Sequence, residues 1–275
     1  MQTERVLRAA ALSCMLGGLV LAGCAGPRVP DTGGETDGTP ARPPDVSRIP
    51  DAVPRYEPRS QRGNPPFYEV LGQRYYVMKE AAGYRERGVA SWYGTKFHGR
   101  MTSSGEPYDM YAMTAAHKTL PLPSYVRVTH RGNGRSIVVR VNDRGPFVGE
   151  RIIDLSYAAA VRLGMHNDGT ALVDVEAIAP GATAEAPVVA ADAAAVRPEP
   201  VWLQVGAFSD EANAARLSAR LADEGIHDVV TLSEQHARRR IYRVKIGPMT
   251  AVDEVERMLE RVRELGITDA HLATD

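Results

Sequence analysis

The stretch from Gly88 to Phe147 limits the fold of this chain more than any other part of it. A glycine-bounded apolar run spans Gly88 to Gly94, Val126 to Thr129 alternates, and Ile137 to Val141 is rich in β-branched residues. Such runs predict short strands. Between the last two lies Arg131-Gly132-Asn133-Gly134-Arg135, which is typical of a hairpin turn. We therefore expect antiparallel β-structure here.

The residues that follow add one helix and one more strand. Asp154 is expected to cap a short helix from Leu155 to Leu163, which Gly164 ends. Ala171 to Ile178 alternates again. Many short strands with a single helix predict a small all-β barrel.

Three titratable side chains of this stretch are candidates for proton chemistry, namely Glu106, His117 and Asp143. Asp143 comes where a predicted strand gives way to the Gly145-Pro146 turn, so a rigid frame would hold its carboxyl. Each residue also has an ordinary explanation. Asp-Arg-Gly-Pro is good turn chemistry by itself, Glu106 lies in a polar loop, and His117 precedes a lysine.

Three segments of the chain resemble the double-psi β-barrel of the rare lipoprotein A family. They are SWYGTKFHGRMTSSGEPYDMYAMTAAHKTLPLPSYVRV, VVRVNDRGPF and RIIDLSYAAAVRLGM, within residues 88–179. The resemblance implies a lytic transglycosylase of the septal ring. Such an enzyme cleaves peptidoglycan between N-acetylmuramic acid and N-acetylglucosamine and leaves a 1,6-anhydro end. The resemblance also implies that Glu106, His117 and Asp143 form the catalytic site.

This chemistry needs a proton for the leaving oxygen and stabilisation of an oxocarbenium-like transition state. Because the C6 hydroxyl of the sugar replaces water, one carboxyl can act first as acid and then as base. We assign that role to Asp143, with Glu106 beside it, although the two roles are interchangeable at this stage. Trp92 and Tyr93 would stack on sugar rings or belong to the core. Asp154 caps the helix or reaches the groove.

The N-terminus predicts export and lipidation. Arg5 and Arg8 precede a short apolar run, and Leu21-Ala22-Gly23-Cys24 resembles the lipobox of bacterial lipoproteins. We expect residues 1–23 to be a signal peptide and Cys24 to carry the acyl chains (palmitate among them), which anchor the protein to the outer membrane, facing the periplasm. Residues 24–66 are rich in proline and glycine, and we expect a disordered tether.

Residues 67–87 form a lead-in segment, and residues 180–200 form an Ala/Pro linker. After the linker, residues 201–275 show a βαββαβ pattern. Strands are predicted from Val201 to Phe208, Val229 to Leu232 and Ile241 to Ile246, with helices capped by Asp210 and ended by Gly266. This order predicts a small α+β domain of the ferredoxin-like kind.

The segments WLQVGAFSDEANAARLSARL and YRVKIGPM resemble the SPOR repeat. That family binds glycan strands that lack stem peptides, which gather at division sites. Period-two alternation places Gln204, Arg243 and Lys245 on one face of the sheet, where they would bind sugar hydroxyls or simply be solvated. The resemblance implies enrichment at the septum and partners in the cell-division machinery.

Charge and cysteine content exclude several other functions. The formal net charge is −1, and no basic stripe interleaves with aromatic residues, so we expect no nucleic acid partner. The only cysteines are Cys14 and Cys24, and no metal-ligand cluster or phosphate loop appears, so we expect neither metal nor cofactor. Two alternatives stay open: a non-catalytic peptidoglycan binder with an expansin-like barrel, and a plain hydrolase that yields reducing ends.

Overall fold

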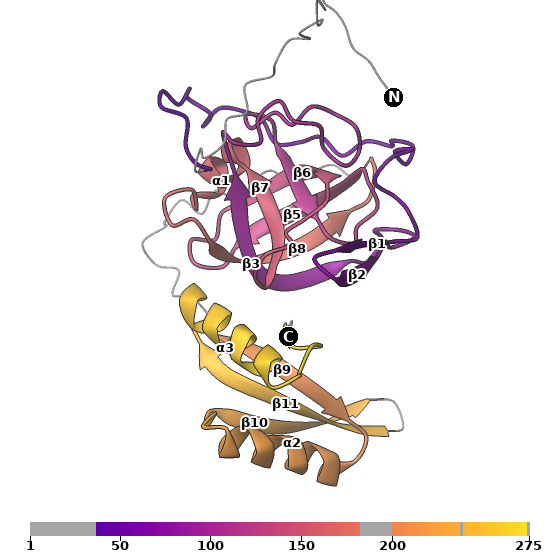
Figure 1. The fold of residues 1–275 in the computed structure, drawn as a ribbon, viewed down its shortest axis with the longest axis vertical. Helices are drawn as coiled ribbons and strands as arrows, with labels where there is room; N and C mark the ends of the chain where they lie inside the picture. The colour runs from indigo at the N-terminus through magenta and orange to yellow at the C-terminus, as the bar shows by residue number, and fades with distance from the viewer. Residues whose placement is uncertain (1–36, 182–199, 237–238, 274–275) are drawn as a thin grey trace, which may run out of the picture. The chain divides into compact units, whose positions relative to one another are not determined.

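The computed structural model describes residues 37–181, 200–236 and 239–273, and its first part contains a closed β-barrel (Figure 1). Neighbouring strands run in the order β3, β7, β4, β6, β5, β8, and β8 pairs back to β3, which closes the barrel. The six strands are β3 (Arg85–Tyr93), β4 (Thr114–His117), β5 (Ser124–His130), β6 (Ser136–Asp143), β7 (Arg151–Ser156) and β8 (Ala171–Ile178).

Two of the barrel's strand pairs are parallel, β3 with β7 and β4 with β6, and the others are antiparallel. Fully buried side chains from the strands fill the interior, among them Val126, Val139 and Leu155. Helix α1 (Tyr157–Leu163) packs against β6 and β7 through a run of buried alanines. The predicted double-psi β-barrel is confirmed.

The start of helix α1 differs from the prediction. The N-cap is Ser156, whose Oγ accepts a hydrogen bond from the Ala159 backbone N at 3.2 Å. Asp154 lies two residues earlier, inside β7, so the prediction that it caps the helix is wrong. The sequence also did not predict β4 or β7 as strands. These two strands are central to the site described below.

Residues 37–66 do not form a free tether. Val46 is 3% exposed and belongs to the barrel core. The backbone N of Ala52 donates to the Val138 carbonyl at 3.0 Å, and that of Ser60 donates to the Leu122 carbonyl at 2.9 Å. The predicted disorder is therefore wrong for this part of 24–66.

The predicted lead-in segment, residues 67–87, begins with a hairpin of β1 (Phe67–Val70) and β2 (Gln73–Tyr76). Because residues 37–66 also pack on the barrel, the name lead-in segment covers residues 37–87 from here on. The predicted signal peptide, Cys24 and most of the Ala/Pro linker lie outside the described residues.

The C-terminal domain has the predicted βαββαβ order, and the prediction of its fold is confirmed. Its antiparallel sheet has the strand order β10, β11, β9, β12. Asp210 caps α2 by accepting a hydrogen bond from the Ala212 backbone N at 2.7 Å. The elements are β9 (Val201–Phe208), α2 (Glu211–Asp223), β10 (Val229–His236), β11 (Arg239–Met249), α3 (Val252–Glu264) and β12 (His271–Leu272).

None of the helices in the described ranges has the length and apolar character of a membrane-spanning helix.

Candidate active site

Strand β4 brings two carboxyl groups together. Ala116 of β4 is the register partner of Asp143 on β6 and of Asp154 on β7. The β4–β6 register shifts between Ala115 and Ala116, so the pairing brings the two aspartates to neighbouring strands at an irregular point of the sheet. With strands about 4.8 Å apart, their Cα atoms lie about 10 Å from each other. Both carboxylates act on the hydroxyl of Tyr93, which places the two acidic groups around one side chain.

Asp143 ends β6, and three donors fix its carboxyl. Its Oδ1 accepts hydrogen bonds from the Ser103 backbone N at 2.7 Å, the Ser103 Oγ at 2.7 Å and the Arg144 backbone N at 2.8 Å. No described residue donates to Oδ2. One oxygen thus anchors the side chain, and the other is left for a ligand.

The loop that holds Asp143 runs from Thr102 to Glu106 and depends on two glycines. Gly105 has a φ of +92°, which lets the loop turn tightly enough for the Thr102 backbone N to reach the Glu106 carbonyl at 2.8 Å. Gly63 of the lead-in segment lies against the loop, and a Cβ there would sit 2.7 Å from the Ser103 carbonyl oxygen. The lead-in segment therefore backs the loop that orients Asp143.

Asp154 is more enclosed than Asp143, with a side chain 17% exposed. The Ser91 hydroxyl donates to its Oδ1, and Arg151 Nη1 lies 3.6 Å from the same oxygen. Burial raises the pKa of the Asp154 carboxyl despite these two partners. Its Oδ2 lies beside Gly145, 4.0 Å from where a Cβ would be. A buried carboxyl with a raised pKa is suited to carry a proton.

Tyr93 lies close to both aspartates. The negative charges of Asp143 and Asp154, after burial and Tyr108, raise the pKa of its hydroxyl well above the ordinary value. The Tyr93 hydroxyl is buried without a hydrogen-bond partner among the described residues. Its ring stacks on Tyr108 with 4.1 Å between centroids and is 8% exposed, so the ring faces are not open to a sugar.

Glu106 is held as an anion by a bidentate ion pair. Arg140 Nη1 donates to its Oε2 at 2.7 Å and Nη2 to its Oε1 at 2.9 Å, while Asn142 donates to Oε2 at 3.1 Å. These hydrogen bonds, Arg140 first, lower the pKa of the Glu106 carboxyl. Arg140 also pairs with Glu57 of the lead-in segment at 2.8 Å. An ionised, doubly bound carboxylate does not donate a proton.

His117 lies inside the barrel rather than on its surface, with 2% exposure. Its Nδ1 accepts hydrogen bonds from the backbone N atoms of Thr119 and Leu120, both at 3.1 Å, and its Nε2 lies 2.7 Å from the Tyr84 hydroxyl. Burial, followed by the charge of Arg144, lowers the pKa of His117 to about 3. Because Nδ1 is an acceptor, the proton is on Nε2, and the ring is neutral.

Arg144 connects the lead-in segment to β4 next to the site. Its guanidinium donates to the carbonyls of Gly63, His117 and Leu120 at 2.6–3.1 Å. Burial among these neutral acceptors lowers the pKa of Arg144 to about 10. The residue after Asp143 is thereby anchored from two directions.

The other predicted binding residues lie apart from the carboxyl pair. Trp92 is half-buried and packs against the barrel core, with its ring 5.8 Å from that of Tyr157. In the C-terminal domain, Gln204 and Lys245 are register partners, and Arg243 Nη1 donates to Gln204 Oε1 at 2.9 Å. These three side chains form one polar group, but Gln204 and Lys245 are only 8% and 6% exposed, so the group is not the open face that the alternation predicts, and Arg243 is its most exposed member.

The described residues contain no group of three or more His, Cys, Asp or Glu side chains arranged to hold a metal ion. Of the two aspartates, Asp154 is the one that the sequence placed at a helix N-cap, because Asp-Leu-Ser followed by alanines is also a good helix start. The alternation of buried Ile153 and Leu155 around Asp154 was the available signal for a strand.

Comparison with known proteins matches both halves of the chain. The "Lytic transglycolase" family model covers residues 85–175, and the SPOR domain model covers residues 198–272. The endolytic peptidoglycan transglycosylase RlpA of Pseudomonas aeruginosa (strain UCBPP-PA14) is 44% identical over 82% of this chain and 81% of its own. The RlpA of Vibrio cholerae is 42% identical over 93% and 94%. The solved SPOR domain of Pseudomonas aeruginosa RlpA is 30% identical, covers 27% of this chain and 99% of its own, and has a TM-score of 0.25.

The closed barrel and the two family models define a lytic transglycosylase of the double-psi barrel type, followed by a SPOR domain. The chain belongs to the RlpA family of endolytic peptidoglycan transglycosylases. The family resemblance stated from the sequence is confirmed.

Proposed function

We propose that the barrel cleaves peptidoglycan glycan strands between N-acetylmuramic acid and N-acetylglucosamine and leaves a 1,6-anhydro end. The observation that carries this proposal is the placement of Asp143 and Asp154 on the two strands that flank Ala116, with both charges acting on Tyr93. Membership of the RlpA family supports the reaction class.

In the proposed reaction, Asp154 is the acid. Its carboxyl, whose pKa burial raises, protonates the glycosidic oxygen as the bond from that oxygen to C1 breaks. The Asp143 carboxylate stabilises the positive charge that develops at C1. The C6 hydroxyl of the same sugar then attacks C1, and its proton returns to Asp154. No water is consumed, and the enzyme ends in its starting protonation state.

This assignment differs from the one that the sequence favoured, in which Asp143 was acid and base and Glu106 its partner. Both oxygens of Glu106 are bound to Arg140 and Asn142, so Asp154 is the better proton donor. We propose that Glu106 holds the Thr102–Glu106 loop, and that neutral His117 positions the end of β4. Neither then needs to touch the reacting atoms.

The natural substrate, we propose, is glycan that lacks stem peptides, reached through the C-terminal domain. Gln204, Arg243 and Lys245 supply donors and an acceptor for sugar hydroxyls on one face of the sheet. We further propose that Cys24 is lipidated, which would hold the protein on the periplasmic side of the outer membrane at the division septum. Metabolic labelling with a palmitate analogue tests this, since Cys24→Ala should abolish the label.

The experiment that tests the site compares three purified full-length variants on peptide-free glycan. Asp154→Asn and Asp143→Asn should each lower the rate of strand cleavage by about 10²–10⁴-fold, the usual contribution of a positioned acid or charge stabiliser. The control is Asp109→Asn, because the Asp109 side chain is 58% exposed and lies outside the barrel strands. Unchanged cleavage by Asp154→Asn, with Asp143→Asn inactive, would return the acid role to Asp143. Binding without any cleavage by the wild type would favour the non-catalytic alternative.

A further inference from the structure

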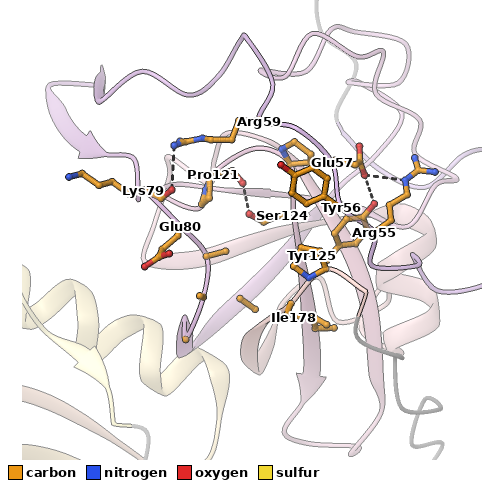
Figure 2. A pocket seen from close by; sticks show the side chains of 17 residues that line it. Arg55, Tyr56, Glu57, Arg59, Lys79, Glu80, Pro121, Ser124, Tyr125 and Ile178 are labelled. Atoms are coloured by element: carbon orange, nitrogen blue, oxygen red, sulfur yellow. Dashed lines mark hydrogen bonds and ion pairs between the residues drawn. The ribbon is translucent and has the colours of Figure 1, made fainter.

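A pocket of about 560 Å³ lies on the barrel (Figure 2). Its walls come from the lead-in residues 55–59, the 79–83 segment, the loop at 121–125 and the end of β8 with residues 179–180. Small-molecule sites in proteins occupy roughly 300–1,000 Å³. The space is therefore adequate for a sugar unit of a glycan strand.

The lining combines apolar surface with one exposed aromatic ring. Pro121, Pro123 and Ile178 contribute apolar surface, and Tyr56 is 85% exposed. Figure 2 shows the Tyr56 ring in the middle of the lining residues. Such an exposed tyrosine offers a flat face for the C–H face of a sugar ring, and a hydroxyl that stays in water.

Cations outnumber available anions around the pocket. Arg55, Arg59 and Lys79 are exposed lining residues, whereas Glu57 and Glu80 are the only acidic ones. Glu57 is already bound by Arg140 at 2.8 Å and by Arg55 at 3.4 Å. In Figure 2, Arg59 and Lys79 lie on one side of Tyr56, where Arg59 donates to the Lys79 carbonyl. Figure 2 shows Glu80 on this side as well, so two cations face one carboxylate there, and the excess positive charge favours an anionic group.

Hydrogen bonds join the pocket wall to the loop that holds Asp143. Ser60, which follows the lining residue Arg59, donates from Oγ to the Ser104 carbonyl at 2.9 Å. Ser104 is next to Ser103, the residue that binds Asp143. The lining residue Glu57 also shares Arg140 with Glu106 of the same loop. A ligand in the pocket would therefore contact residues that are bonded to the Thr102–Glu106 loop or adjacent to residues that are.

We propose that this pocket binds an N-acetylmuramic acid unit whose lactyl carboxylate is free, with Tyr56 against the sugar ring and Arg59 and Lys79 at the carboxylate. The inference rests on the proposed function, because it assumes that a glycan strand occupies the active site. It gives a physical reason for a preference for peptide-free strands: removal of the stem peptide exposes this carboxylate.

The test compares two substrates in kinetic assays of the full-length protein. One is peptide-free glycan, and the other is the same glycan with its lactyl carboxylates converted to neutral methylamides. The wild type should have the lower KM for the carboxylate form. Lys79→Gln and Arg59→Gln together should raise that KM about tenfold, because each exposed ion pair contributes up to about fivefold. The KM for the amide and both kcat values should not change.

Two controls separate the possible failures. Arg48→Gln removes an exposed charge that does not line the pocket and should leave the KM for both substrates unchanged. Tyr56→Ala should raise the KM for both substrates alike. If the wild type cleaves both forms with one KM, or if Lys79→Gln with Arg59→Gln changes neither KM, the pocket assignment is wrong. If the wild type cleaves neither form, the proposed function itself fails.

Discussion

At the scale of single residues, His117 shows how the barrel uses a titratable group without charge. Its two ring nitrogens are engaged by Tyr84 and by the backbone after β4. Protonation of Nδ1 would break both backbone hydrogen bonds and bury a cation. The imidazole is therefore neutral throughout the physiological pH range, and it supports the strand end next to Asp143 and Asp154.

His117 gives the protein a defined acid sensitivity. The unfolded chain binds a proton to this residue below pH ~6.5, whereas the folded chain does so only near pH 3. As the pH is lowered from ~6.5 to 3, the free energy of unfolding should therefore decrease by about 1.4 kcal/mol per pH unit through this residue alone. Urea unfolding at several pH values gives the free energy of unfolding of the wild type and of His117→Asn. The difference between the two pH dependences isolates the contribution of His117. Parallel curves for the two proteins would contradict the buried neutral assignment.

The residue scale also separates what sequence can predict from what it cannot. Asp143 was predictable, because a β-branched run followed by a Gly-Pro turn marks a strand end on local grounds. Asp154 was not, because Asp-Leu-Ser-Tyr-Ala is equally good as a helix start. Only pairing of β7 with β4 and β3, which are distant in sequence, decides that Asp154 lies in a strand and close to Asp143.

At the scale of elements, the lead-in segment is part of the catalytic barrel. Composition predicted disorder for residues 37–66, because a chain rich in proline and glycine forms no core of its own. This prediction did not consider that the segment could pack against the barrel. Val46 enters the barrel core, and Glu57 binds Arg140. Ser60 and Gly63 contact the Thr102–Glu106 loop. Whether such a segment folds depends on the surface it meets, which its own residues do not encode.

Gly63→Ala tests the contact between the lead-in segment and the catalytic loop. A Cβ would lie 2.7 Å from the Ser103 carbonyl oxygen, and the φ of +76° disfavours alanine independently. We expect a loss of about 1–3 kcal/mol in the free energy of unfolding and a lower kcat, since Ser103 orients Asp143. Gly72→Ala is the matched control, because its φ is also positive at +79° but nothing lies within 4 Å of the added atom. Equal kcat values for the two variants would mean that the lead-in segment does not support the loop.

Glu57→Gln tests the ion pairs that join the lead-in segment to β6. Hydrogen bonding to Arg140 holds the pKa of Glu57 at about 2. Because the pKa of Glu57 is lower in the folded than in the unfolded chain, the ionised carboxylate stabilises the fold at pH values above the unfolded pKa of 4.5. This contribution is lost as the pH falls towards 2. The variant should be less stable than the wild type by about 1–3 kcal/mol at pH 7, with the difference vanishing near pH 2. Unfolding curves at both pH values check this, and Glu69→Gln, an exposed pair with Arg74, should show little change. A difference that persists unchanged at pH 2 would rule out the charge-based explanation.

At the scale of the whole molecule, the two domains divide the work between cutting and holding. The barrel carries the carboxyl pair, and the SPOR domain carries the polar group of Gln204, Arg243 and Lys245. Arg243→Ala should therefore weaken co-sedimentation with peptide-free sacculi about fivefold to tenfold and leave kcat on short soluble glycans unchanged. Arg257→Ala, on the exposed surface of α3, serves as the control. A fall in kcat with unchanged sedimentation would contradict the division.

The account's central claim is that the carboxyl pair directs the sugar's own C6 hydroxyl, and not water, to C1. Cleavage of peptide-free glycan in heavy-oxygen water, followed by mass spectrometry of the new ends, tests it directly. The account predicts 1,6-anhydro ends without any heavy oxygen. Reducing ends that each carry one heavy oxygen atom would identify a hydrolase and contradict it.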